Sequence, residues 1–123
     1  MLLPSEVEAR VLLPVLRAAV VTILVREHGF QQKQVAKALG ITQPTVSNYL
    51  RMSRGKMREL LETPQMRDVA EEIAAAVLSG EDEMELRELF QRGLERLRRE
   101  RVLCLAHKTL EPVLDIDSCH ICD

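Results

Sequence analysis

Aromatic residues are nearly absent from this chain of 123 residues, which has two Phe, one Tyr and no Trp. Sheet proteins draw on aromatic and β-branched side chains, so this composition disfavours a sandwich or a barrel. Leu, Val, Ile, Met and Ala must then build the core, which is typical of an all-helical protein. The length indicates one domain, or one domain with a short appendage, and makes a multidomain enzyme improbable.

Long apolar runs are also missing. The longest, residues 11–25, contains Pro14 and Arg17 and falls short of the roughly 20 residues that a membrane helix needs. The first ten residues carry two acids and one base, which does not fit a secretory signal. We therefore expect a cytoplasmic protein that does not contact a membrane.

Catalytic motifs are absent as well. The sequence has no Gly-rich phosphate loop, no nucleophile with a base nearby, and no carboxylate pair in a pocket-forming context. We expect no enzymatic activity, and no small-molecule substrate is indicated.

Charge is divided unevenly along the chain. Residues 1–61 carry nine Lys or Arg and four Asp or Glu, a net charge of +5. Because the whole chain carries −2, residues 62–123 carry −7. A basic first half suits a polyanion, whereas the acidic second half does not.

Local start and stop signals predict the first helices. Ser5 with Glu8 forms a capping box, so a helix should begin there. Pro14 should kink this helix or divide it in two, and Gly29 should end it near His28.

The remaining helices are expected over residues 31–39, 43–52, 57–61, 64–79 and from 82 to about 105. The tail from His107 to Asp123 shows no helical period. We divide the chain into a DNA-binding domain (residues 1–61), a helical dimerisation or linker region (62–103) and a Cys/His tail (104–123).

Residues 32–51 satisfy the steric demands of a helix-turn-helix. Gly40 can supply the left-handed turn, Ala36 is small at the helix crossing, and Ile41 plugs the corner. The inward-facing residues are Val35, Leu39, Val46, Tyr49 and Leu50. Helical spacing then places Gln43, Pro44, Ser47, Asn48 and Arg51 on the opposite face, which a recognition helix lays in the major groove.

The outward face has the chemistry for reading DNA. Gln and Asn pair bidentately with adenine, and Arg pairs with guanine. Thr42, Lys33, Arg54 and Lys56 are better placed for phosphates. The expected DNA-contacting residues are Lys33, Thr42, Gln43, Pro44, Thr45, Ser47, Asn48, Arg51, Arg54 and Lys56. The expected partner is double-stranded DNA.

A homodimer is expected, because one recognition helix contacts too few base pairs to select an operator. The two candidate interfaces are the N-terminal apolar helix and the long helix that carries Leu86, Leu89, Phe90, Gly93, Leu94 and Leu97. We expect one to be core and the other interface, with a slight preference for the long helix as the dimer element.

The last twenty residues contain all three cysteines. Cys104 with His107 and Cys119 with Cys122 have the paired spacing of a four-ligand site, and His120 is a second choice for the imidazole. Zinc fits this spacing slightly better than an iron–sulfur cluster. Metal-free thiols, or a disulfide between Cys119 and Cys122, form the third alternative.

Residues 31–51 resemble the helix-turn-helix of phage repressors. The wider pattern is similar to a group of small archaeal predicted transcriptional regulators: LPSEVEARVLLPVLRA, then the motif, then a cysteine-bearing tail that ends in CHIC. The resemblance implies a DNA-binding regulator with Gln43, Ser47 and Asn48 as base readers and the tail cysteines as a metal or cluster site.

We therefore expect a transcriptional regulator whose C-terminal centre is structural or senses redox or metal state. The alternative is a metal-stabilised interaction module, or an antitoxin-like adaptor, without sequence-specific DNA binding. Salt dependence separates the two, because only a DNA reader should lose affinity steeply with salt.

Overall fold

The computed structural model describes residues 1–110, so Cys119, His120 and Cys122 lie outside the described residues. The described part is helical and has no strand, which confirms the all-α fold class. Its α-helices are α1 (Pro4–Val7), α2 (Leu13–Thr22), α3 (Gln32–Leu39), α4 (Gln43–Met52), α5 (Arg58–Leu61), α6 (Pro64–Leu78), α7 (Glu83–Arg99) and α8 (Val102–Leu110). Two π-helical segments, Glu8–Leu12 and Ile23–Glu27, flank α2.

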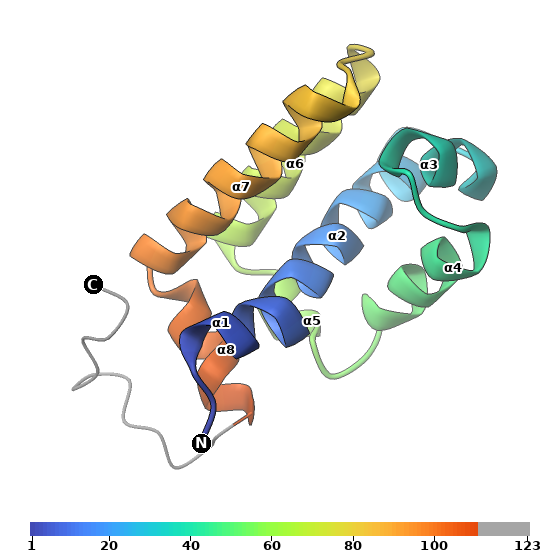
Figure 1. The fold of residues 1–123 in the computed structure, drawn as a ribbon. Coiled ribbons are helices and arrows are strands. Elements are labelled where there is room, and N and C mark those ends of the chain that lie inside the picture. The colour runs from blue at the N-terminus through green and yellow to red at the C-terminus, as the bar shows by residue number, and fades with distance from the viewer. Residues whose placement is uncertain (111–123) are drawn as a thin grey trace.

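Helix α2 is the central element of the fold. Helices α3 and α4 lie on one side of it and the α6–α7 hairpin on the other, while α8 packs against α1 and α7 (Figure 1). Leu16, Ala18, Val20 and Val21 of α2 are completely buried, and one hydrophobic cluster connects all these elements. The N-terminal helix is therefore core.

The N-terminal helix differs in detail from expectation. It begins at Pro4, and Glu6 rather than Glu8 accepts a hydrogen bond, from the Leu3 backbone N–H at 3.1 Å. A π-helical turn precedes Pro14, in which the Leu13 N–H donates to the Glu8 carbonyl. A π turn at this position takes up the missing donor and the bulk of the ring, so the chain stays helical across Pro14.

Most other start and stop signals are confirmed. The side chains of Thr63 and Asp82 accept hydrogen bonds from the backbone at the starts of α6 and α7. Gly29 and Gly80 adopt φ angles of +69° and +76°, each directly after the C-cap residue of a helical segment. Caps and glycines act within one helical turn, which is why sequence reasoning finds them.

The prediction that the last helix continues to about Leu105 is wrong. Helix α7 ends at Arg99, Arg101 adopts a left-handed φ of +65°, and α8 begins at Val102. Val102 and Leu103 are buried, so the break turns an apolar run onto the core. Residues 107–110 belong to α8 and are not the start of an irregular tail.

The long helix α7 packs largely within the chain. Leu86, Leu94 and Leu97 are buried, and Gly93 lies so close to α6 that a Cβ atom there would overlap the Val69 side chain. Leu89 and Phe90 are half-buried. Among residues 1–110, no helix is both long and apolar enough to span a membrane.

Candidate nucleic-acid interface

Helices α3 and α4 form the expected helix-turn-helix. Gly40 adopts a φ of +65° after α3, and the Ile41 N–H donates to the Ala36 carbonyl at 3.0 Å, which closes the turn. Val35 and Val46 are fully buried between the two helices and the rest of the core. The packing that the motif requires is therefore present.

The turn leads directly into the N-terminus of α4. Thr42 caps this helix: its Oγ1 accepts from the Thr45 N–H at 3.3 Å and lies 2.7 Å from the Thr45 hydroxyl. Pro44, in the first turn, has no N–H to leave unsatisfied. Backbone donors and the positive end of the helix dipole make this end suitable for a phosphate.

The outward face of α4 carries the expected base-reading residues. Gln43, Pro44, Asn48 and Arg51 are exposed on it. Asn48 Oδ1 accepts a hydrogen bond from the Arg51 guanidinium one turn later, so the two polar heads lie together. Each could exchange this contact for a base edge, Asn48 at adenine and Arg51 at guanine.

Ser47 has a different environment from the other expected readers. It is half-buried, and its hydroxyl donates to Gln32 Oε1 at 2.6 Å, which ties α4 to the start of α3. Gln32 was not among the expected site residues. Gln31 and Gln32 stand at the start of α3, but only the packing of α3 against α4 shows which of the two glutamines contacts α4.

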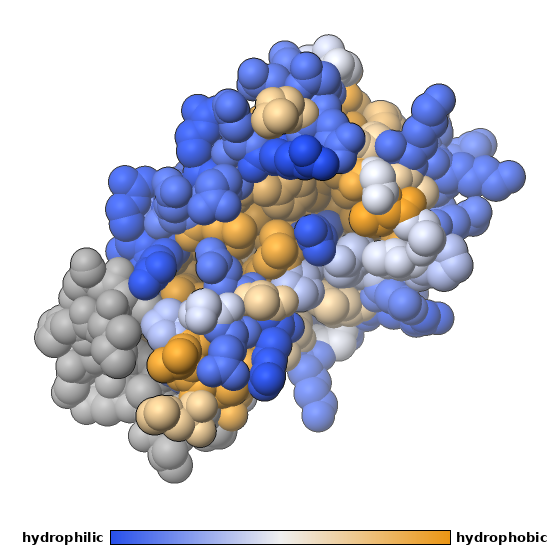
Figure 2. All heavy atoms as spheres, viewed as in Figure 1, coloured by the Kyte–Doolittle hydropathy of each residue, from blue (hydrophilic) through white to orange (hydrophobic). Residues whose placement is uncertain are grey.

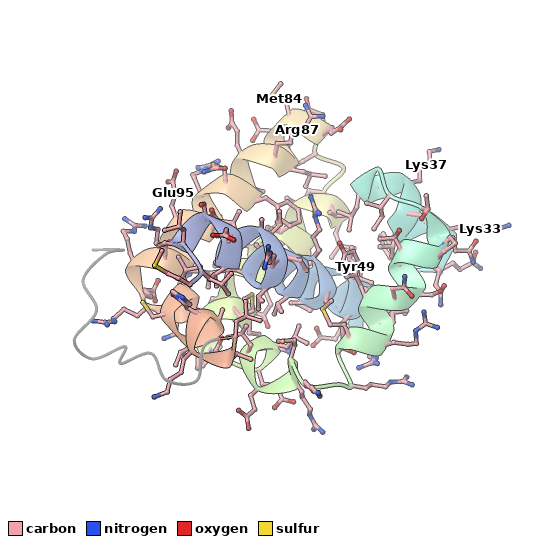
Figure 3. The ribbon with its side chains drawn as sticks, turned by 60° about the horizontal axis from the view of Figure 1, so that its bottom comes forward. Lys33, Lys37, Tyr49, Met84, Arg87 and Glu95 are labelled. Atoms are coloured by element: carbon pink, nitrogen blue, oxygen red, sulfur yellow. The ribbon has the colours of Figure 1, made fainter. Side chains whose placement is uncertain are left out.

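The electrostatics of the motif are one-sided. Residues 28–58 contain no Asp or Glu, and they contain six Lys or Arg. The exposed bases Lys33, Lys37, Arg54 and Lys56 make no ion pair within residues 1–110. Figure 3 shows Lys33 and Lys37 extending outward from α3. Sequence reasoning did not assign Lys37 to the site, although its spacing of four from Lys33 places both on one helix face.

The expected metal ligands are only partly described. Cys104 is buried in α8 and His107 is half-buried one turn later, so the two residues lie on the same face of that helix. Within residues 1–110, no group of three or more His, Cys, Asp or Glu is placed to hold a metal ion. The other two expected ligands, Cys119 and Cys122, lie outside this range.

Comparison with known proteins identifies one family. The family model described as the ParB HTH domain matches residues 10–99, a span that begins before α2 and ends with α7. The searches of curated proteins and of solved structures gave no match. The similarity to archaeal regulators stays a prediction.

Proposed function

Because the chain belongs to the ParB HTH domain family, we propose that it is a sequence-specific regulator of transcription that reads the major groove of DNA with α4. The observation that carries this proposal is the motif surface itself. It combines a base-reading face, an N-terminus open to phosphate, and a basic segment without a single carboxylate. This combination is what the two components of DNA recognition, phosphate positioning and base readout, require.

Selection from random double-stranded DNA, followed by fluorescence anisotropy on the enriched sequence, tests the proposal. We expect a strong preference for one sequence, and a log–log salt slope that becomes shallower by about 0.9 for each phosphate contact removed. Lys33→Ala should reduce the slope by this amount. Arg98→Ala is the matched control, since Arg98 is exposed near the end of α7, away from the motif. Equal enrichment of all sequences would contradict the proposal.

We also propose that the protein acts as a homodimer, with two α4 helices about 34 Å apart on one face of the duplex. The support is functional, since one α4 helix presents few base-reading residues. Sedimentation equilibrium with and without the selected DNA tests this. A dimer should bind and protect two half-sites of the selected DNA, separated by one helical turn. A monomer that protects one half-site would contradict the proposed homodimer.

For the C-terminal region, we propose a metal or cluster centre held by Cys104, His107, Cys119 and Cys122. The support is the donor chemistry, because three thiols and an imidazole suit zinc slightly better than an iron–sulfur cluster. Metal and sulfide analysis after anaerobic purification separates these alternatives. Cys119→Ser should abolish the bound metal, and unchanged metal content would refute the ligand set.

A further inference from the structure

A groove of about 470 Å³ separates the helix-turn-helix from the α6–α7 hairpin. Its lining includes Arg17 of α2, Leu39 and Ile41 at the α3–α4 turn, and Glu83, Arg87 and Phe90 of α7. Figure 2 shows apolar surface in the hollow between the hairpin and α3. The motif and the hairpin thus both pack on α2 but leave a space between their facing sides that both apolar and polar side chains line.

The positive charge in this groove is not fully matched by carboxylates. The Arg87 guanidinium pairs with Glu83 at 2.8 Å, and Glu83 is the one carboxylate in the lining. Arg17 is half-buried, and its guanidinium makes no hydrogen bond or ion pair within residues 1–110. A guanidinium has five N–H donors in a rigid fork that matches a carboxylate, so Arg17 is equipped to hold an anion there.

We propose that this groove binds a small amphipathic anion, a carboxylate with a hydrocarbon tail. The carboxylate pairs with Arg17, and the tail lies against Leu39, Ile41 and Phe90. The volume falls within the roughly 300–1,000 Å³ of small-molecule sites. The lining divides almost evenly between polar and apolar surface, which suits a ligand that has both a charged head and a hydrocarbon tail. An apolar ligand would leave Arg17 unpaired, and a small polar anion would leave the apolar walls uncovered.

The position of the groove implies a regulatory consequence, which rests on the proposed DNA-binding function. Ile41 lines the groove and is followed directly by Thr42, the cap of α4. A bound anion therefore contacts the motif on one side and α7 on the other. If the bound and empty forms place these walls differently, the ligand changes DNA affinity, and DNA changes ligand affinity by the same factor.

Calorimetric titration with octanoate tests the binding site, with octanol and acetate as matched probes. Octanoate should bind at least tenfold more tightly than either one. Arg17→Met keeps an unbranched stem and removes the charge, so it should abolish the preference for octanoate over octanol. Arg92 is also on α7 but does not line the groove, so Arg92→Met should leave the preference for octanoate intact. Equal binding of octanoate by wild type and Arg17→Met would overturn the proposal.

A second variant distinguishes a ligand from a second copy of the chain. Ala38 lines the groove and is half-buried, so Ala38→Trp should fill the space and abolish octanoate binding while the variant still melts cooperatively. If the wild type takes up no octanoate, and its dimer dissociates in Ala38→Trp, the groove is a contact between copies and the proposal fails.

DNA binding is then measured with and without saturating octanoate. A several-fold change in affinity that is absent in Arg17→Met supports the regulatory part, and an unchanged affinity overturns that part alone. Octanoate binding without any sequence preference for DNA would refute the proposed function and leave the groove assignment standing. Sequence-specific DNA binding without octanoate uptake would refute the groove assignment and leave the proposed function standing.

Discussion

The helix-turn-helix and the α6–α7 hairpin are both rich in arginine or lysine, but they use these residues differently. In the hairpin, Arg67, Arg87, Arg92 and Arg96 pair with carboxylates, mostly one helical turn away, and only Arg98 and Arg99 at the end of α7 make no ion pair within residues 1–110. In residues 28–58, which contain the motif, five of the six exposed bases have no ion pair within residues 1–110, and the segment contains no acid. Paired surface charges cancel each other's field, whereas unpaired ones attract a polyanion.

This contrast explains how a chain with a net charge of −2 can bind DNA. The negative charge lies in the second half of the sequence, and in the hairpin much of it is matched locally. Arg67 ties the hairpin to the end of the N-terminal helix: its hydrogen bond to Glu27, and the charge of that carboxylate, raise the pKa of its guanidinium. Acids near the hairpin therefore need not repel a duplex that lies on the motif.

The strongest way to break the contrast is to place acids in the motif. The double variant Lys33→Glu, Lys37→Glu removes two proposed phosphate contacts. At about 1.5 kcal/mol for each contact to a charged group, it should weaken DNA binding on the order of 100-fold. Fluorescence anisotropy against salt checks this, and the slope should fall by about 1.8.

The fold of this double variant should be unchanged, because both lysines are exposed. A melting temperature close to the wild-type value is the control. If DNA affinity were unchanged at every salt concentration, the α3 face would not contact phosphate.

A change at Gly93 should affect the hairpin without affecting the charges of the motif. Gly93→Ala places a methyl group against Val69, and overpacking of this kind costs about 1–3 kcal/mol. Urea denaturation measures the loss. Gly55→Ala is the matched control, since its Cβ would meet the Met52 carbonyl at an ordinary 3.6 Å.

The stability loss in Gly93→Ala should leave the salt slope of DNA binding unchanged for the folded fraction. A shallower slope would mean that the position of the hairpin controls the phosphate contacts. That result would join the two regions that the charge pattern separates.

Within the motif, Asn48→Ala separates base reading from phosphate attraction. A bidentate pair with a base is worth about 1–3 kcal/mol of discrimination, so one position of the preferred sequence should become less selective by this amount. Affinity for nonspecific DNA should be nearly unchanged, because no charge is altered. An unchanged selection profile would show that Asn48 does not read a base.

The motif was predictable from sequence because its signals are local. Gly40, Thr42 and Pro44 fix the end of α3 and the start of α4, and both helices lie within one residue of the expected bounds. The break at Arg101 was missed because a non-glycine residue adopts the left-handed conformation there. The π-helical turns likewise lack a recognisable sequence signal.

The interface was predictable only in part. Side-chain type identified Asn48 and Arg51, but the bond between Ser47 and Gln32 joins residues 15 apart and depends on how α3 and α4 pack. The unpaired state of the Arg17 guanidinium depends on which side chains the α3–α4 turn and α7 bring to the groove, which no local pattern contains. Tertiary packing decides which polar groups are consumed within the chain and which are left for a ligand.

The smallest expected effect comes from adding positive charge to the hairpin. Asp68→Asn removes the 3.3 Å ion pair to Arg96 and raises the net charge by one unit. The loss of a lysine from the motif lowers the net charge by one unit instead. Asp68 is exposed and Arg96 is half-buried at the surface, so this is a surface ion pair and stability should fall by less than about 1 kcal/mol. DNA affinity should change by less than twofold at physiological salt, since charges beyond a Debye length of about 8 Å are screened. Lys33→Ala, which also changes the charge by one unit, should give the larger effect. If the two variants changed DNA affinity equally, total charge would govern binding, and the separation between a paired hairpin and an unpaired motif would have no functional meaning.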